Sequence, residues 1–432
     1  MATGAMVGEV RRGAMEGAFS ISSVGRPKSS ESNGDRRNWK MGWHIGHPLR
    51  PARRGGLYGW MSSKLAPAKP GKTKTQPDSE RYFFEGPDPV TWIHIRGTVH
   101  HFELPRQLVT ITLGSAESCD IVVPSQYVSR HHLTIERRHG GIRIHDHSKN
   151  GTYIDARRIG DDRDIRAGQG FSAGAASFIA LNDEMARQYA LLSDLIDWET
   201  STELESQSSR FATPCDAIEI ASGVDHLMIA GDVGCGQAQL AEAIHAMSPL
   251  RGRPLVRVDS IPVDRGAQKE LLARAARATM VLAIGDEMPV MDDAFRSSLF
   301  ALSYRIRLIV LAWPRRARAV LGEDRSNMQR LDLRPIAYRE HVQIERLLDR
   351  QLEARGCALR LAHMTETNRS ALLRYSWPRN FDDLKLAADR LAAIARAGSL
   401  RKAAAALDEH ASKVQHWFTN QLGLELPLNA AG

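Results

Sequence analysis

The spacing of apolar positions changes twice along the chain, and each change marks a different kind of structure. From Val90 to about residue 182, short runs of alternating or β-branched residues are separated by turn residues. Such regular short runs are typical of an all-β sandwich. The predicted strands are Thr91–Ile95, Leu108–Leu113, Asp120–Val123, His132–Glu136, Ile142–His145, Tyr153–Ile154 and Ser177–Leu181.

Near Asp183 the spacing becomes helical over Glu184–Asp197, and a Ser-, Thr- and Glu-rich linker follows to about Ser209. From Phe211 to about Ile336, apolar strands alternate with helical segments, which predicts a parallel sheet covered by helices. These strands are Leu227–Ala230, Leu255–Val258, Met280–Ile284 and Leu308–Leu311. The remainder, to about Leu422, has the spacing of helices.

Length and charge refine this division. The 432 residues exceed what one core usually holds, so several domains are expected. Residues 1–80 hold 14 Lys and Arg against 6 Asp and Glu, which accounts for the whole net charge of +8 and leaves 44 of each in residues 81–432. This segment is rich in Gly, Ser and Pro without apolar periodicity, so it is predicted to be disordered. It is either a basic arm for nucleic acid or targeting, or a solvated leader ahead of a start at Met61.

Several classes of protein are disfavoured. No apolar run approaches the roughly 20 residues of a membrane span, and no apolar stretch follows the early arginines as a secretory signal requires. The four cysteines are far apart, which argues against a zinc site or a disulfide framework. We therefore expect a cytoplasmic protein without a metal or cofactor.

The β-rich segment contains two polar blocks, Val128-Ser129-Arg130-His131-His132 and Ser148-Lys149-Asn150-Gly151-Thr152. A shorter segment, Leu113-Gly114-Ser115, precedes them. Over residues 92–182 the chain resembles the forkhead-associated (FHA) family, whose pattern is Gly-Arg, Ser-x-x-His and Asn-Gly on successive loops at one end of a β-sandwich. The resemblance implies that this domain binds phosphothreonine peptides. Rigidly held hydroxyl, amide and guanidinium groups are the donors that a phosphate dianion requires.

Site residues follow from the family's motif by position. Ser129 would donate to the phosphate, Arg130 would add charge, and Asn150 would hold the peptide backbone. The full phosphopeptide-binding set is Ser115, Ser129, Arg130, Lys149, Asn150 and Thr152, and the residues that shape the loops are Gly114, His132 and Gly151.

Ser115 departs from the family, which usually has an Arg there as a direct phosphate ligand. Loss of one charge-assisted contact costs about 1.5–3 kcal/mol, a tenfold to hundredfold loss of affinity. Two interpretations remain open: a weakened phosphopeptide reader, or an FHA-shaped scaffold that binds an unphosphorylated partner.

The α/β segment has a strand ending at Ala230, the loop Gly231-Asp-Val-Gly234-Cys-Gly236-Gln237, and a helix that includes Ala243-Ile244-His245. It resembles the AAA+ domain of sigma-54-dependent transcription activators, where Gly-x-x-Gly-x-Gly-Lys-Glu links the same elements. In that family the backbone N–H groups of the loop cradle phosphates, and the Lys neutralises the β- and γ-phosphates. Here the Lys is replaced by neutral Gln237.

Other parts of the ATP machinery are altered in the same direction. Trp313 stands where the family has a sensor Asn, and Asp382 where it has a nucleotide-sensing Arg; the sigma-54-gripping loop has no counterpart in Val258–Ala278. Asp286 and Glu287 either hold Mg²⁺ and activate water or begin the next loop. The degenerate nucleotide site comprises Gly231, Gly234, Gly236, Gln237, Asp286 and Glu287. We predict no catalytic residues and no ATP hydrolysis; the alternative is an ATP-hydrolysing activator with a divergent site.

The segment Gly398–Leu424 resembles the helix-turn-helix that closes those activators. Its first helix would be Leu400–Leu407, and Ser412 would cap the recognition helix. The DNA-binding candidates are Lys413, Gln415, His416 and Asn420. Residues 398–432 hold only three basic and three acidic side chains, so the alternative is a helical pair packed on the lid with Val414 and Trp417 in its core.

The chain is therefore predicted to be a multidomain protein, with an all-β FHA sandwich, an α/β AAA+-like P-loop core, a helical lid and a helix-turn-helix. The predicted boundaries are 1–80 for the tail, 90–182 for the FHA domain, 183–210 for a helix and linker, 211–336 for the core, 337–397 for the lid and 398–424 for the helix-turn-helix. The expected partners are a threonine-phosphorylated protein and DNA, not a membrane, and self-association is compatible with the resemblance. The predicted role is a signalling adaptor or transcription regulator.

Overall fold

The computed structural model describes residues 88–98, 100–106, 109–160, 162–196, 212–285, 291–301, 303–312 and 320–429. All of them belong to one compact unit, residues 77–432. The tail predicted over residues 1–80 and the linker predicted to reach Ser209 lie outside the described residues.

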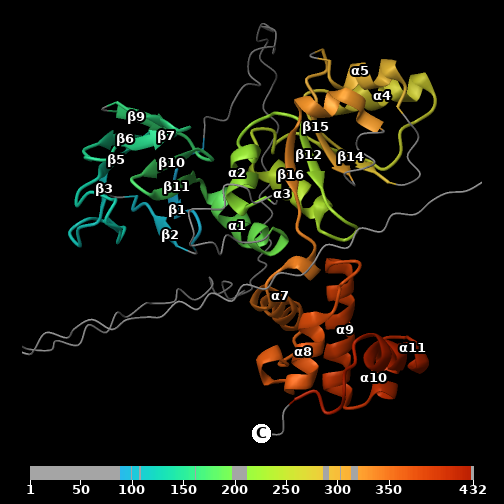
Figure 1. Ribbon diagram of the computed structural model, residues 1–432. Coiled ribbons are helices and arrows are strands. Elements are labelled where there is room, and N and C mark those ends of the chain that lie inside the picture. Colours follow the sequence, from blue (N-terminus) through green and yellow to red (C-terminus); the bar gives the residue numbers. More distant parts are fainter. Residues whose placement is uncertain are drawn as a thin grey trace, which may run out of the picture. The chain divides into compact units, whose positions relative to one another are not determined.

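Within the described residues, the β-rich region consists of eleven short strands. Figure 1 labels most of them. They are β1 (Trp92–Ile95), β2 (His101–Glu103), β3 (Thr110–Gly114), β4 (Ile121–Val122), β5 (Leu133–Arg138), β6 (Gly141–Asp146), β7 (Thr152–Ile154), β8 (Arg157–Arg158), β9 (Asp162–Ile165), β10 (Gly170–Ala173) and β11 (Ala176–Leu181).

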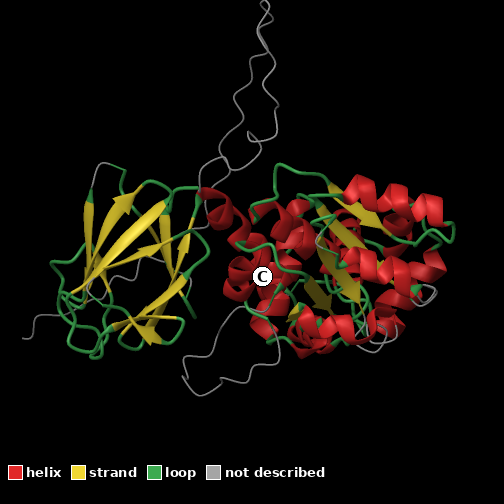
Figure 2. Cartoon of the chain, turned by 90° about the horizontal axis from the view of Figure 1, so that it is seen from above, coloured by secondary structure: helices red, strands yellow, loops and turns green. Residues whose placement is uncertain are grey.

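These strands form two sheets that enclose one core (Figure 2). One sheet has the order β4-β3-β5-β6-β9 and the other β2-β1-β11-β10-β7-β8. Alternate residues point inward, as a two-residue period requires, so that Ile111 and Ile144 from the first sheet meet Ile93 and Phe178 from the second. The predicted sandwich is confirmed.

The seven predicted strands are present with shifted ends, but β2, β8, β9 and β10 were not predicted. For β8 and β9 the reason is their composition. Both residues of β8 are exposed, and in β9 only Ile165 is buried. Short strands with so few buried positions lack the apolar alternation on which sequence-based prediction depends.

The α/β region has five parallel strands in the order β13-β14-β15-β12-β16. Its elements are α2 (Pro214–Ala221), β12 (Leu227–Ala230), α3 (Gln237–Met247), β13 (Leu255–Val258), α4 (Arg265–Ala275), β14 (Thr279–Ile284), α5 (Asp293–Leu299), β15 (Arg307–Ala312) and β16 (Gln329–Asp332). Helix α1 (Asp183–Leu195) precedes them. The four predicted strands are confirmed, and β16 was missed because only one of its residues is buried.

Both faces of this sheet are covered, which explains its nearly continuous apolar strands. On β12, Leu227 and Ile229 belong to one core cluster, which also contains residues of α1, α2 and α3. Met228 faces the opposite cluster, with residues of α4 and α5. The carboxyl end of the inner strand β12 leads directly into the glycine-rich loop, at the edge of the sheet where parallel α/β folds bind ligands.

The last part of the chain is helical. It contains η2 (Ile336–Tyr338), α7 (His341–Ala354), η3 (Leu361–His363), α8 (Glu366–Arg374), α9 (Phe381–Ala397), α10 (Leu400–Ala406), α11 (Ala411–Gln415) and a π-helical turn (His416–Gln421), after a 3₁₀ turn at Gly322–Asn327. Helix α9 packs against both α7 and α10, and Leu384, Leu391 and Trp417 lie in the shared core.

The cap predicted at Ser412 is wrong. Helix α11 already begins at Ala411, and its N-cap is His410, without a side-chain hydrogen bond. Asp408 just before it has a φ of 53°, and the Glu409 N–H bonds back to the carbonyl of Ala404, so the turn between the helices ends earlier than the sequence indicates.

Candidate functional site

Ser129 lies where three loops of the sandwich meet. Its hydroxyl accepts a hydrogen bond from the backbone N–H of Lys149 at 3.2 Å. Its carbonyl accepts one from the backbone N–H of Ser115 at 3.0 Å. The Ser129 side chain is half-buried, whereas Arg130 and Lys149 are exposed. The structure therefore brings together the Ser115, Ser129 and Lys149 segments that the sequence predicted to act together.

Asn150 and Gly151 form the tip of the loop between β6 and β7. The exposed Asn150 side chain donates to the carbonyl of Tyr127 at 2.9 Å, which ties this loop to the one that carries Ser129. Gly151 has a φ of 87°, a conformation that side chains rarely adopt, and its N–H donates to Ser148 Oγ at 2.8 Å. Tyr127 was not predicted from the sequence, since an aromatic residue in a loop carries no motif of its own.

His132 joins the same two loops from inside the sandwich. It is fully buried, its Nδ1 accepts the N–H of Ser129 at 3.0 Å, and its Nε2 lies 3.3 Å from the carbonyl of Gly151. Because Nδ1 accepts, the hydrogen of a neutral ring is on Nε2 and donates to Gly151. Burial lowers the pKa of His132. The ring is thus a neutral crosslink, in keeping with the predicted loop-structural role.

Gly114 is required for close approach rather than for an unusual φ. A Cβ at this position would lie 2.1 Å from the carbonyl oxygen of Arg130. The neighbouring hydrogen bond from the Ala116 N–H to that carbonyl, 3.0 Å long, depends on the same approach.

Thr152 does not line the groove as expected. It is fully buried, and its hydroxyl donates to Asp146 Oδ1 at 3.0 Å. Thr152 is the first residue of β7, and its side chain supports the loop from below instead of facing a ligand.

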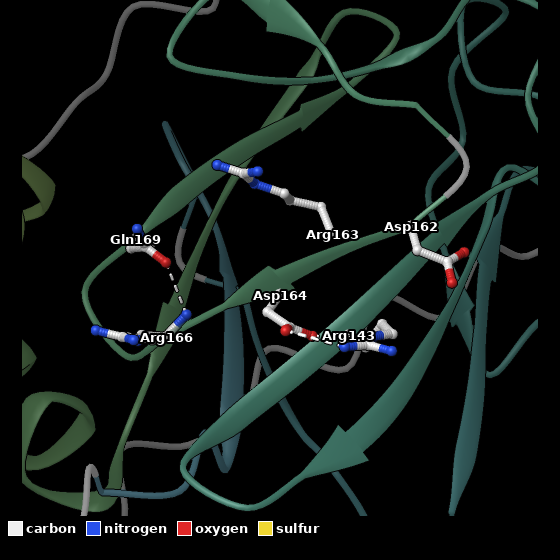
Figure 3. A pocket seen from close by; sticks show the side chains of 6 residues that line it. All are labelled: Arg143, Asp162, Arg163, Asp164, Arg166 and Gln169. Atoms are coloured by element: carbon white, nitrogen blue, oxygen red, sulfur yellow. Dashed lines mark hydrogen bonds and ion pairs between the residues drawn. The ribbon is translucent and has the colours of Figure 1, made fainter.

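A cavity of about 510 Å³ on the sandwich lies elsewhere, at β6, β9 and the turn before β10 (Figure 3). It is lined by Arg143, Asp162, Arg163, Asp164, Arg166 and Gln169. Arg143 is paired with Asp164 at 2.7 and 3.0 Å, and Gln169 accepts the N–H of Arg166 at 2.8 Å. None of the predicted phosphopeptide-binding residues lines this cavity, so it is not the candidate site.

Hydrogen bonds within the chain hold the glycine-rich loop after β12 in place. The Gln237 side chain donates to the carbonyl of Gly231 at 2.9 Å. Gly234 and Gly236 have φ values of 74° and 89°, as the strand-to-helix turn requires, and Gly236 is the N-cap of α3. A Cβ on Gly236 would lie 2.7 Å from the side chain of Leu195.

Residues at the start of α9 pack directly onto this loop. The Phe381 N–H donates to the carbonyl of Gly234 at 3.0 Å, and Asn380 donates to the carbonyl of Val233 at 2.9 Å. A Cβ on Gly234 would lie 2.1 Å from the Arg379 carbonyl and 3.1 Å from an Asp382 carboxylate oxygen. A carbonyl and a carboxylate oxygen thus lie beside Gly234, in the loop that the resemblance expects to bind phosphate. Asp286, Glu287 and Trp313 lie outside the described residues.

Cys235 lies within this loop. It is buried, and burial raises the pKa of its thiol to about 11, so the thiolate is not formed near neutral pH.

At the C-terminal end, the predicted DNA-binding side chains are on the surface. Lys413, Gln415, His416 and Asn420 are all exposed. Val414 and Trp417, interleaved with them, are buried in the helical core. Helix α11 and the π-helical turn thus have one polar outer face and one apolar inner face.

Among the helices that the structure describes, none combines the length and apolar character needed to cross a membrane. In the same part of the chain, no group of three or more His, Cys, Asp or Glu side chains is arranged to hold a metal ion.

Residues 111–174 match the FHA domain family. Together with the two-sheet sandwich and its loops, this match identifies the β-rich region as an FHA domain. Over part of its length the chain is also similar to sigma-54-dependent transcription activators. It is 27% identical over 282 residues to the anaerobic nitric oxide reductase transcription regulator NorR of Citrobacter koseri, an alignment that covers 55% of each protein.

The chain thus spans about half the length of the curated relatives it matches. Among solved structures, the FHA domain of the CT664 protein from Chlamydia trachomatis matches with 25% identity and a TM-score of 0.20, covering 21% of this chain and 95% of that one. NtrX from Brucella abortus in complex with ATP matches with 16% identity and a TM-score of 0.33, covering 54% and 71%.

Proposed function

We propose that this chain is a regulator that binds threonine-phosphorylated protein segments through its FHA domain. The observation that carries the proposal is the convergence of Ser129, Lys149 and Asn150 from two loops tied together by buried His132. Hydroxyl, backbone amide and side-chain amide donors fixed in this way suit a phosphate and the backbone beside it. Exposed Arg130 and Lys149 supply positive charge nearby.

The test compares a library of phosphothreonine peptides with the same library unphosphorylated, using the full chain. We expect tighter binding of the phosphorylated form, and loss of that difference in Ser129→Ala and Asn150→Ala. His139→Ala is the control, because exposed His139 is in the β5–β6 turn, at the opposite end of β6 from the Asn150 loop. Equal affinity for both libraries in the parent protein would support the unphosphorylated-partner interpretation instead.

We further propose that the α/β core does not hydrolyse ATP. The support is the neutral Gln237 bonded to Gly231 and the packing of Asn380, Phe381 and Asp382 on the loop. Losing one phosphate-stabilising group costs about 2–4 kcal/mol of barrier, and residues of one site act as a unit.

The assay is steady-state phosphate release with a parallel melting curve. A micromolar ATP site at millimolar Mg·ATP would add about 4 kcal/mol of stability, so we expect no turnover and no shift in the melting temperature. Gln237→Lys alone should not restore hydrolysis. Robust turnover by the parent chain would instead favour an ATP-hydrolysing activator with a divergent site.

DNA binding is a second candidate function, supported by the exposed polar face formed by Lys413, Gln415, His416 and Asn420. We expect binding to duplex DNA to weaken with salt and to be reduced in Lys413→Ala and His416→Ala. Lys269→Ala, an exposed change on α4, is the matched control. Unchanged binding in both C-terminal variants would support the alternative that these helices only pack on the lid.

A further inference from the structure

Arg158, in the short strand β8, lies against the tip of the Asn150–Gly151 loop. A Cβ on Gly151 would lie 2.7 Å from Arg158 Nε and 3.1 Å from its Cδ. This contact arises from pairing, because Tyr153 on β7 is opposite Arg158 on β8, and the Ile159 N–H bonds to the carbonyl of Thr152 at 2.9 Å. The stem of the Arg158 side chain is therefore placed beside the loop by the sheet itself.

The charge of Arg158 is available to a ligand. The residue is exposed, and no carboxylate among the residues that the structure describes forms an ion pair with it. Exposed Lys149 is two residues before Gly151, so two cationic side chains flank the tip of this loop. By contrast, the Ser115 position contributes no charge.

Arg158 is displaced along the loop from the position expected for the phosphate. Ser129 contacts the loop at the backbone N–H of Lys149, whereas Arg158 contacts it two residues later, at Gly151. Asn150 lies between these two contacts. If Ser129 binds the phosphate and Asn150 the peptide backbone, the Arg158 guanidinium is next to a neighbouring side chain of the peptide.

We propose that Arg158 sets the sequence preference of the domain, selecting phosphothreonine segments with an acidic residue close to the phosphothreonine. The proposal rests on the phosphopeptide-binding function inferred above. An Arg guanidinium binds a carboxylate through two parallel hydrogen bonds, which gives selectivity as well as affinity. Because the site is exposed to solvent, the expected preference for an acidic over a neutral neighbour is about threefold to tenfold.

The experiment measures binding of the full chain to phosphothreonine libraries in which each flanking position carries Glu, its uncharged isostere Gln, or Lys. The parent protein should prefer Glu at one flanking position, and Arg158→Gln should abolish that preference while retaining binding to the Gln library. Arg158→Glu should invert the preference towards Lys, and Arg158→Lys should retain part of it. Arg157→Gln is the matched control, because adjacent residues of a strand point to opposite faces.

The possible outcomes distinguish the role of Arg158 from the phosphopeptide-binding function on which it rests. Phosphorylation-dependent binding with equal affinity for Glu and Gln libraries would overturn the role of Arg158 and leave the phosphopeptide function intact. An equal loss of affinity for every phosphopeptide in Arg158→Gln would also overturn it, since the guanidinium would then act on the phosphate itself. Absence of any phosphorylation dependence in the parent protein would overturn the underlying function.

Discussion

Asn380 links the helical lid to the glycine-rich loop, and its replacement tests whether that loop is held closed. The side chain is 2% exposed. Its Nδ2 donates to the carbonyl of Val233 at 2.9 Å, and its Oδ1 accepts the N–H of Ile336 at 2.8 Å. One amide therefore joins three segments of the chain.

The free-energy cost of removing the Asn380 side-chain amide depends on the two backbone groups that would lose their hydrogen-bond partner. The Ile336 N–H is on a fully buried residue and would lose its partner, at about 1–3 kcal/mol. Val233 is 44% exposed, so water can replace the bond to its carbonyl, at no more than about 1 kcal/mol. Asn380 also has a φ of 51°, which glycine adopts freely and alanine does not. We expect Asn380→Gly to cost about 2–3 kcal/mol, and Asn380→Ala about 1 kcal/mol more.

Hydrogen exchange of the amides of residues 231–240 measures the destabilisation of the loop caused by replacing Asn380. It reports the free energy of local opening and does not require the whole chain to unfold in one step. Both variants should lower the opening free energy of these amides. Arg379→Ala is the control, since exposed Arg379 forms only a surface ion pair with Asp383. Exchange in Asn380→Gly as slow as in the parent protein would refute the idea that this amide holds the loop closed.

Three further predictions concern the FHA domain. Ser115→Arg should tighten phosphopeptide binding about tenfold or more by restoring a charge-assisted contact, and unchanged affinity in titration calorimetry would indicate a repurposed surface. Gly114→Ala should lower the melting temperature by several degrees because its Cβ would lie 2.1 Å from the Arg130 carbonyl, whereas Gly160→Ala, with nothing within 4 Å, should not. Burial lowers the pKa of His94 to about 3, so its stabilisation is complete above pH 6.5 and falls by about 1.4 kcal/mol per unit as pH decreases towards 3. Denaturant titrations between pH 7.5 and 5 should show this decline, and His94→Gln should make it shallower.

The sequence predicted best what a single segment determines. The Ser129 and Asn150 blocks, the strands that precede them and strands β12 to β15 of the parallel sheet all carry local patterns of apolar and polar residues. Strands β8 and β9 carry none, because most of their residues face solvent. Thr152 was misjudged for a similar reason. A shift of one residue exchanges the buried and the exposed faces of a strand such as β7. The motif does not show whether Thr152 points towards the core or towards solvent.

Contacts between segments that are distant in the sequence could not be predicted. Arg158 acquires its position from the pairing of β7 with β8, and Asn380 from contacts with residues 147 positions earlier and 44 positions earlier. The sequence showed that Gln237 removes a positive charge from the glycine-rich loop. It gave no sign that the start of α9 packs on that loop, because such packing depends on how the lid lies against the sheet.

The two glycine-containing loops of this chain differ in the charge of the groups beside them. Both contain glycines at positive φ and backbone donors, as anion-binding loops require. At the FHA loop the flanking side chains, Lys149 and Asn150, are exposed, and the internal tie is a neutral histidine that leaves the outer surface open. At the loop after β12, the Arg379 carbonyl and an Asp382 carboxylate oxygen lie beside Gly234, and Asn380 bonds the carbonyl of Val233. Negative groups beside Gly234 oppose a phosphate there, whereas exposed Lys149 next to Asn150 favours one, which is why the proposals above assign phosphate binding to the FHA loops.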